Sequence, residues 1–246
     1  DIHCGMRGIT RDALVKMGLV SQSWEYASEM VLKSVRMELV TTEVPVTFLK
    51  DRDGRLSHHK RSGWFSPFHA AWINLRAMFV HGAEFFLFKP GIALLALGLL
   101  LTLPLTFGPI TIGEVTLSLY SMLIGVTLSV VGLQSIYFGC LAHIFLDYTG
   151  RRRRRWQRIF QYTNTVIASA VLFVIGFILD VILVIDYVRH SFSLPDPQSL
   201  INHAAITGLL FMIFGFSTFC FTLLLHATQV RYGMPDDLSL HKESGK

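Results

Sequence analysis

Arginine residues in two short segments are the first candidates for chemistry in this sequence. Arg7 lies in "CGMR", and Arg55 lies in "KDRDGRLSHHKR", within a stretch, 50–63, that holds seven basic residues when both histidines are counted. A guanidinium group can form two parallel hydrogen bonds to a phosphate, so both arginines are candidates for an anion-binding site. Two other interpretations stay open. Arg7 could hold a turn by pairing with Asp1 or Asp12, and the basic stretch could be a solvated loop that faces a membrane.

Carboxylates form a second group of candidates. Glu25, Glu29 and Lys33 follow one another at four-residue spacing, which places them on one face of a helix. An ordinary Glu–Lys pair on the surface accounts for this spacing, and a carboxylate that acts as a general base is the functional alternative. Asp180 is a third candidate, because it falls inside a long apolar segment where a carboxylate is costly and often functional.

The composition is that of a membrane protein joined to a smaller soluble part. Hydrophobic residues make up 52% of the 246 residues and charged residues only 16%, whereas charged residues are about a quarter of a soluble domain. Residues 1–63 have an ordinary composition, and residues 91–228 are strongly apolar. Three scattered cysteines are too few for a disulfide framework, and no P-loop, Ser/His/Asp pattern or zinc spacing is present. The sequence therefore predicts no metal site within this chain.

Four long apolar segments predict four membrane-spanning helices, because about 20 apolar residues cross a bilayer core. They cover residues 91–107, about 117–145, 165–185 and about 204–225. The first segment is short and contains Pro104, and Gly108 with Pro109 marks a tight turn after it.

Lysine and arginine residues alternate between the segments that join the spans, and this alternation predicts the orientation. The segment before the first span and the run "RRRRRWQR", 151–158, are basic, whereas 108–116 has no Lys or Arg and 186–203 has only Arg189. Both termini and the arginine run are therefore expected on the cytoplasmic side of the cell (inner) membrane. A basic run can also bind nucleic acid. Between two spans it is expected to contact anionic headgroups instead, so no nucleic-acid partner is expected.

Large apolar side chains recur at helical spacing between the soluble part and the first span. Ser66 and Pro67 are a typical helix start. The side chains at spacings of three, four and seven are Trp64, Phe68, Trp72, Leu75, Phe79 and Phe86. Such a stripe can pack in a protein core. Beside a membrane span and basic residues, it predicts an amphipathic helix, 64–89, that lies in the cytoplasmic interface.

Residues 1–63 predict the last part of an α/β domain. Thr10 is expected to cap a short helix that ends at Gly18, and Ser23 is expected to cap a second helix. The segment "TTEVPVTFL", 41–49, alternates like an edge strand. Two helices and one strand are too little for a stable core, so we expect the rest of this domain upstream of residue 1.

The order of three motifs resembles the end of the catalytic domain of family 2 glycosyltransferases, and most closely the polyprenyl-phosphate subset similar to dolichyl-phosphate mannosyltransferase. The motifs are "DIHCGMRGITRDAL", "WEYASEM" and "EVPVTF", followed by the basic loop and then by membrane helices. The resemblance implies the end of a GT-A-like catalytic domain at 1–63, the interfacial helix at 64–89, a four-helix transmembrane region at 90–228 and a cytoplasmic tail at 229–246. The expected fold class is an α-helical multi-pass membrane protein with four spans, preceded by the C-terminal remnant of an α/β glycosyltransferase domain.

The same resemblance implies transfer of a hexose from a nucleotide sugar to a polyprenyl phosphate at the cytoplasmic face. It implies a divalent metal, Mg²⁺ or Mn²⁺, held by an Asp-x-Asp motif in a donor-binding half that this sequence lacks, so the chain alone is expected to be inactive. Glu29 would lie near the acceptor as a catalytic residue. The phosphate-binding residues would be Arg7, Arg52, Arg55, Ser57 and His58, and the motif residues would be Asp1, Cys4 and Gly5.

A function of a different class is left open by the same residues. Residues 64–246 could form a non-catalytic membrane module that handles lipids or acts as an assembly scaffold. A homo-oligomer is compatible with either function. A donor-binding half with an Asp-x-Asp motif upstream of residue 1 would favour the enzyme over the scaffold.

Overall fold

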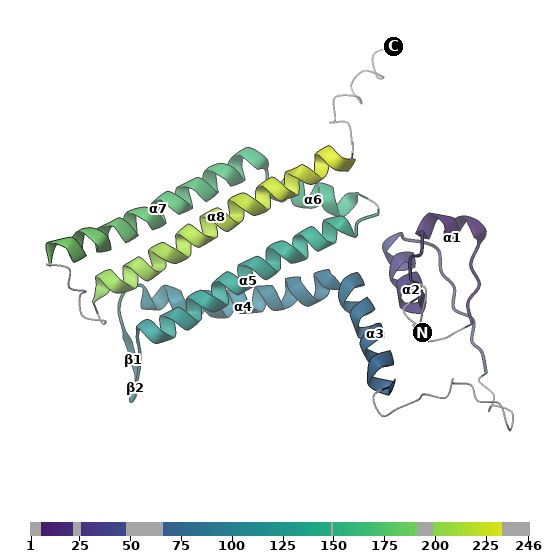
Figure 1. The fold of residues 1–246 in the computed structure, drawn as a ribbon, viewed down its shortest axis with the longest axis horizontal. Coiled ribbons are helices and arrows are strands. Elements are labelled where there is room, and N and C mark those ends of the chain that lie inside the picture. The colour runs from purple at the N-terminus through teal and green to yellow at the C-terminus, as the bar shows by residue number, and fades with distance from the viewer. Residues whose placement is uncertain (1–5, 22–25, 48–65, 149, 191–198, 233–246) are drawn as a thin grey trace, which may run out of the picture.

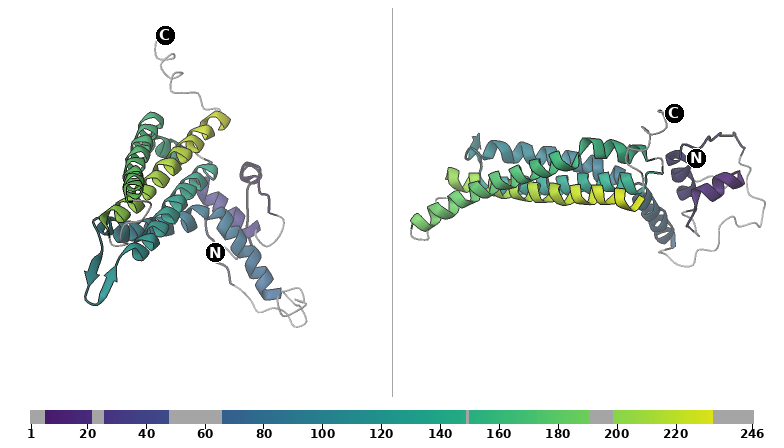
Figure 2. Two further views of the ribbon diagram at one scale, coloured as in Figure 1. Left: turned by 60° about the vertical axis from the view of Figure 1, so that its left-hand side comes forward. Right: turned by 90° about the horizontal axis from the view of Figure 1, so that it is seen from above.

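Helices dominate the computed structural model, which describes residues 6–21, 26–47, 66–148, 150–190 and 199–232. Long helices form a bundle, and the short helices of the soluble part lie beyond one end of it (Figure 1). The view from above in Figure 2 shows the same arrangement, with an elongated bundle and the soluble helices at one end.

The soluble part contains helices α1 (Arg11–Met17) and α2 (Tyr26–Arg36). The Thr10 side chain accepts a hydrogen bond from the Ala13 amide at 3.3 Å, and Gly18 ends α1 with a left-handed φ of 50°. Both features are usual helix boundaries, and they confirm the predicted short helix. Ser23, the predicted cap of α2, lies outside the described residues.

The predicted edge strand at 41–49 is wrong over its described part. Residues 41–47 are irregular, and the side chains of Val44 and Val46 are exposed. A strand exists only through hydrogen bonds to a neighbouring strand, and none is described within residues 6–21 and 26–47. Alternation alone was therefore not sufficient to form a strand here.

Four helices in the described part of the chain are long and apolar enough to cross a membrane, which confirms the four predicted spans. They are α4 (Ala83–Leu105), α5 (Leu119–Phe145), α7 (Tyr162–Arg189) and α8 (Leu200–Tyr232). α4 begins directly after Gly82, so its 23 residues include the last part of the predicted interfacial helix. The shorter helices α3 (Ser66–His81) and α6 (Arg151–Ile159) lie at the end of the bundle near the soluble part (Figure 1).

A small hairpin joins α4 to α5 at the opposite end of the bundle. Strands β1 (Ile110–Ile112) and β2 (Val115–Leu117) are antiparallel, and Ile112 pairs with Val115. Gly113 and Glu114 therefore form a two-residue turn, in which Gly113 has a φ of 63°. Only a turn at Gly108 was predicted here, although "ITIGEVTL" carries the alternation and the Gly of a hairpin.

Glycines at seven-residue spacing bring α4 and α5 into backbone contact. They are Gly91 and Gly98 in α4, and Gly125, Gly132 and Gly139 in α5. A Cβ atom added to Gly98 would lie 2.6 Å from the Gly125 carbonyl oxygen, and one added to Gly91 would lie 2.9 Å from the Ile136 nitrogen. No side chain larger than that of glycine fits at these two positions. A seven-residue repeat keeps such a seam turned toward the partner helix along its length.

The second pair of long helices, α7 and α8, is built in the same way. A Cβ atom at Gly176 of α7 would lie 2.8 Å from the Met212 nitrogen, and one at Gly215 of α8 would lie 2.6 Å from the Ser169 carbonyl oxygen. Close approach of small residues is a common basis of helix association in lipid, where the hydrophobic effect does not drive helices together. The bundle thus consists of two tightly packed helix pairs.

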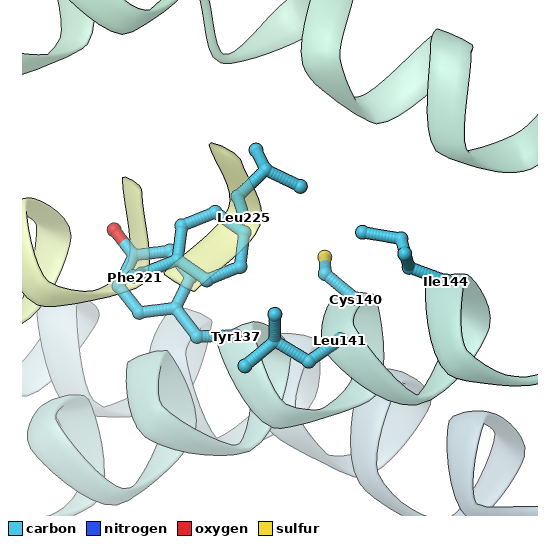
Figure 3. Packing of buried hydrophobic residues seen from close by; sticks show 6 residues of the cluster. All are labelled: Tyr137, Cys140, Leu141, Ile144, Phe221 and Leu225. Carbon is cyan, nitrogen blue, oxygen red and sulfur yellow. The ribbon is translucent and has the colours of Figure 1, made fainter. Parts of the chain in front are cut away.

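An aromatic cluster joins the two pairs through α5 and α8, at the end of the bundle near α6. The Tyr137 and Phe221 rings stack with centroids 4.3 Å apart and an interplanar angle of 7°. The Tyr137 hydroxyl group also forms a 2.7 Å hydrogen bond with Thr218. Figure 3 shows the buried members of the cluster: Tyr137, Cys140, Leu141, Ile144, Phe221 and Leu225.

Replacing Gly98 with Leu should destabilise the bundle, because the new side chain has no space between α4 and α5. Overpacking typically lowers the free energy of unfolding by about 1–3 kcal/mol, and a larger loss is expected against backbone atoms. Thermal unfolding of the purified protein in detergent measures the effect. Ala96→Leu is the matched control, because Ala96 is exposed on the same helix. Equal unfolding temperatures for the two variants would contradict the seam.

Candidate functional site

Two of the predicted site residues, Arg7 and Glu29, lie within the described residues. The others lie outside them: Asp1, Cys4, Gly5, Arg52, Arg55, Ser57 and His58. The roles of these seven residues stay predictions. The site can therefore be built from Arg7, Glu29 and the groups that surround them.

Arg7 connects the segment before α1 to helix α2. It is half-buried, and its Nη1 atom donates a hydrogen bond to the Ala27 carbonyl oxygen at 2.5 Å. This bond favours the interpretation in which Arg7 holds local structure, although the expected partners were Asp1 and Asp12. Its phosphate-binding role stays a prediction.

Glu29 is buried in α2, with 1% of its surface exposed. Its carboxylate accepts hydrogen bonds from the amides of Val20 at 3.0 Å and Ser21 at 2.7 Å, and it pairs with Lys33 at 2.6 Å. Lys33 also donates to the Gly18 carbonyl oxygen at 2.8 Å. The spacing suggested an ordinary surface pair. The structure shows a buried pair that ties the residues after α1 to α2.

The protonation of Glu29 is set by these hydrogen bonds. Burial alone would raise the pKa of the Glu29 carboxyl group, but the bonds from Lys33, Ser21 and Val20 outweigh it and lower the pKa to about 2. A carboxylate with so low a pKa is a weak base near neutral pH, since an efficient general base has a pKa near the working pH. This geometry favours a positioning role, and the catalytic role of Glu29 stays a prediction.

An ionic network that the sequence analysis missed joins the soluble helices to the bundle. Nη2 of Arg36, at the end of α2, lies 2.7 and 2.5 Å from the two carboxylate oxygens of Glu84, at the start of α4. Arg152 of α6 lies 3.8 Å from the same carboxylate, and Arg151 pairs with Glu38 at 3.2 Å. The sequence signal was Glu84 itself, an isolated carboxylate just before an apolar segment.

A cavity of about 230 Å³ lies beside this network, where α2, α5 and α6 meet. Charged side chains dominate its lining, which consists of Val35, Arg36, Glu38, Leu146, Asp147, Arg151 and Arg152. The cavity is therefore a polar space at the junction between the soluble part and the end of the bundle.

The predicted interfacial stripe is exposed in the structure. Phe68 and Trp72 are 67% and 57% exposed, and Leu75, Phe79 and Phe86 are also exposed. These side chains do not pack in a protein core, and α3 points away from the axis of the bundle (Figure 1). Trp64 lies outside the described residues. Insertion of the stripe into the membrane interface stays a prediction.

Polar side chains also lie between the spans, toward the hairpin end of the bundle. Asp180 of α7 is half-buried against Gly208 of α8, where an added Cβ would lie 2.7 Å from the Asp180 Oδ1 atom. Thr106 and Thr207 share a 2.8 Å hydrogen bond between α4 and α8. A functional role of Asp180 stays a prediction.

The described residues offer no group of three or more His, Cys, Asp or Glu side chains that could hold a metal ion. These residues therefore do not fit the divalent metal that the family resemblance implies.

The fold and the site define a class: a membrane protein with four spans, whose soluble helices, arginine-rich helix and ionic network gather at one end of the bundle. Comparison with known families then identifies the region more closely. Residues 140–229 match the family described as the glycosyltransferase family 2 C-terminal transmembrane region. This match confirms the resemblance to family 2 glycosyltransferases that the soluble motifs indicated.

A curated relative supports the same family. The chain is 28% identical over 147 residues to the low-salt glycan biosynthesis hexosyltransferase Agl6 of Haloferax volcanii. The aligned region is 60% of this chain and 33% of that relative, so the chain matches about a third of the relative's length. No solved structure matches the chain.

Replacing Glu29 with Gln should destabilise the contact between α1 and α2, because hydrogen bonds to a charged group contribute about 1.5–3 kcal/mol. The stabilising effect of the charge is complete above the ordinary pKa of 4.5 and is lost as the pH falls through about 2. Hydrogen–deuterium exchange of residues 18–36 near neutral pH should be faster in Glu29→Gln. In acid unfolding, the difference from the wild type should narrow between pH 4.5 and about 2.

Glu38→Gln is the control, because Glu38 is exposed and its pair with Arg151 is on the surface. It should leave exchange in 18–36 unchanged. Unchanged exchange in Glu29→Gln as well would contradict the positioning role.

Proposed function

We propose that this chain is the membrane part, and the adjoining acceptor side, of an enzyme that transfers a hexose from a nucleotide sugar to a polyprenyl phosphate at the cytoplasmic face. The observation that carries the proposal is the match of residues 140–229 to the family 2 membrane region. The similarity to a hexosyltransferase supports a hexose as the transferred sugar. The polyprenyl phosphate is suggested by the resemblance of the soluble motifs.

In the proposed reaction, an oxygen of the acceptor phosphate attacks the anomeric carbon of the sugar. The bond from that carbon to the nucleoside diphosphate breaks, and the diphosphate leaves with the bonding electrons. A phosphate monoester has its second pKa near 6, so the acceptor is largely ionised at neutral pH without a strong protein base. This chemistry is compatible with a Glu29 whose pKa is about 2.

The end of the bundle near α6 suits such a reaction. The soluble helices, the exposed stripe of α3 and the charged cavity at the ionic network all lie there. A lipid acceptor would keep its chain among the spans while its phosphate reached this polar junction. Arginines are suited to orient a phosphate there, since the guanidinium fork matches two phosphate oxygens.

A divalent metal, when bound in the complete enzyme, would stabilise the negative charge of the leaving diphosphate. We place its ligands outside this chain, in a donor-binding half. The chain by itself is accordingly proposed to be inactive.

Membranes from cells that express the complete gene should transfer labelled hexose from a UDP- or GDP-sugar to added polyprenyl phosphate. The product should enter the organic phase and release the sugar under mild acid, because it is an anomeric phosphodiester. Polyprenol without the phosphate is the control and should accept no sugar. A folded protein that transfers none of these hexoses to lipid would instead favour the non-catalytic scaffold.

The proposed orientation can be tested separately by labelling single cysteines from outside intact cells. In a cysteine-free background, a cysteine at Glu114, in the hairpin, should be labelled by an impermeant maleimide. A cysteine at Gln161, between α6 and α7, should be labelled only after the membrane is permeabilised. Labelling of Gln161→Cys in intact cells would contradict cytoplasmic placement of the arginine helix.

A further inference from the structure

Helix α6 has an apolar face that fixes it to the end of the bundle. Trp156 and Phe160 pack against the buried cluster of α5 and α8. The ring centroids of Phe160 and Phe221 are 5.0 Å apart, and those of Trp156 and Phe88 are 5.7 Å apart. These contacts from α4, α5 and α8 determine which side of α6 faces away from the protein.

Asp147 fixes the beginning of α6. Its Oδ1 atom accepts the Gly150 amide and its Oδ2 atom accepts the Arg153 amide, both at 3.0 Å. Arginines in a first helical turn are unfavourable, because the helix dipole is positive there. The Asp147 carboxylate offsets this effect, so the helix can hold a dense row of cations in a defined orientation.

The other face of α6 presents four exposed arginines, which we call the arginine stripe: Arg151, Arg154, Arg155 and Arg158. Their spacings of three, four and seven place them along one side of the helix. Together with Ile159, they line an open hollow of about 640 Å³. The stripe is therefore a continuous basic surface and not a set of scattered charges.

The positive charge of the stripe exceeds the acidic charge paired with it. Arg151 pairs with Glu38 at 3.2 Å, but the two side chains are 77% and 60% exposed, so water and salt weaken this pair. Arg155 and Arg158 have no ion-pair partner in the part of the chain that the structure describes. Within the described residues, the charges of Arg155 and Arg158 therefore stay available for an anionic ligand.

The position of α6 indicates what this molecule is. The helix lies between the end of α5 at Phe145 and the start of α7 at Tyr162, both of which are candidate spans. Ile159 and Tyr162 beside the stripe are exposed, and tyrosine is enriched where a span meets the headgroups. The short connections hold the stripe at headgroup level, where lipid phosphates are the most abundant anions.

We propose that the arginine stripe is a binding site for anionic phospholipids, whose headgroup phosphates lie in the hollow along α6. Each guanidinium group can contact two phosphate oxygens while its apolar stem lies along the membrane surface. Bound lipid would hold α6, and through Arg152 and Glu84 the ionic network, at a fixed depth in the membrane. The site goes beyond the proposed transferase function, and either can fail without the other.

The test is native mass spectrometry of the whole protein in detergent during titration with phosphatidylglycerol or phosphatidylcholine. The wild type should bind phosphatidylglycerol more tightly than phosphatidylcholine. The triple variant Arg154→Gln, Arg155→Gln, Arg158→Gln should bind phosphatidylglycerol at least about tenfold more weakly and phosphatidylcholine as before. The matched control Arg11→Gln, Lys16→Gln, Arg189→Gln removes the same charge from exposed positions elsewhere and should leave both affinities unchanged.

Three results of the lipid titration would overturn the proposal. They are equal wild-type affinity for the two lipids, an unchanged affinity in the stripe variant, and an equal loss in the control variant. Glycerol phosphate at the same phosphate concentration should not displace the lipid, and efficient displacement would overturn the proposal by showing a site for free phosphate. If the stripe variant does not fold, the same titration of the wild type at two salt concentrations tests the proposal. Salt screens charge, so the preference for phosphatidylglycerol should weaken between about 50 mM and 500 mM salt. A preference independent of salt overturns the proposal.

Discussion

Direct backbone contact within two helix pairs is the constraint on which the rest of the structure depends. Where Gly91 and Gly98 meet α5, and where Gly215 meets α7, no Cβ atom fits between the helices. The seams align α4 with α5 and α7 with α8, and the aromatic cluster around Tyr137 then joins the pairs. The starts of α4 and α7 and the end of α5 consequently lie at one end, where α6 and the soluble helices attach.

The spans were predictable because the bilayer imposes its thickness on composition, and a sequence window detects that directly. Contacts between residues far apart in the sequence could not be predicted in this way. The Arg36–Glu84 pair joins residues 48 positions apart, and although Glu84 stands out before an apolar segment, no local pattern indicates its partner. The four-residue spacing of Glu29 and Lys33 gave their common helix face but not their burial, which depends on the residues after α1. The predicted strand is absent over residues 41–47 for the same reason, because alternation cannot supply the neighbouring strand.

The arginine run illustrates what the structure adds to a pattern of charge in the sequence. Its position between two spans indicates orientation through charge alone, and any arrangement of the same cations would do so. The structure shows that α6 has an apolar face and a basic face. Trp156 and Phe160 pack the apolar face against the bundle, and the cap by Asp147 fixes the start of the helix. The structure thereby arranges these charges as an ordered surface, and this order is the basis of the proposed lipid site.

The chemistry expected of this region is mostly positioning. A carboxylate with a pKa of about 2, held by two amides and a lysine, is too stabilised to remove a proton efficiently near neutral pH. A phosphate acceptor does not need a general base to remove its proton, because it is already largely ionised. What it needs is a fixed distance from the donor, and that distance depends on how rigidly the soluble part is attached to the spans. The half-buried Arg36–Glu84 pair supplies this attachment in a place where removing either partner would leave a poorly solvated charge. On the proposed function, the ionic network therefore affects catalysis through geometry, although neither residue touches the reacting atoms.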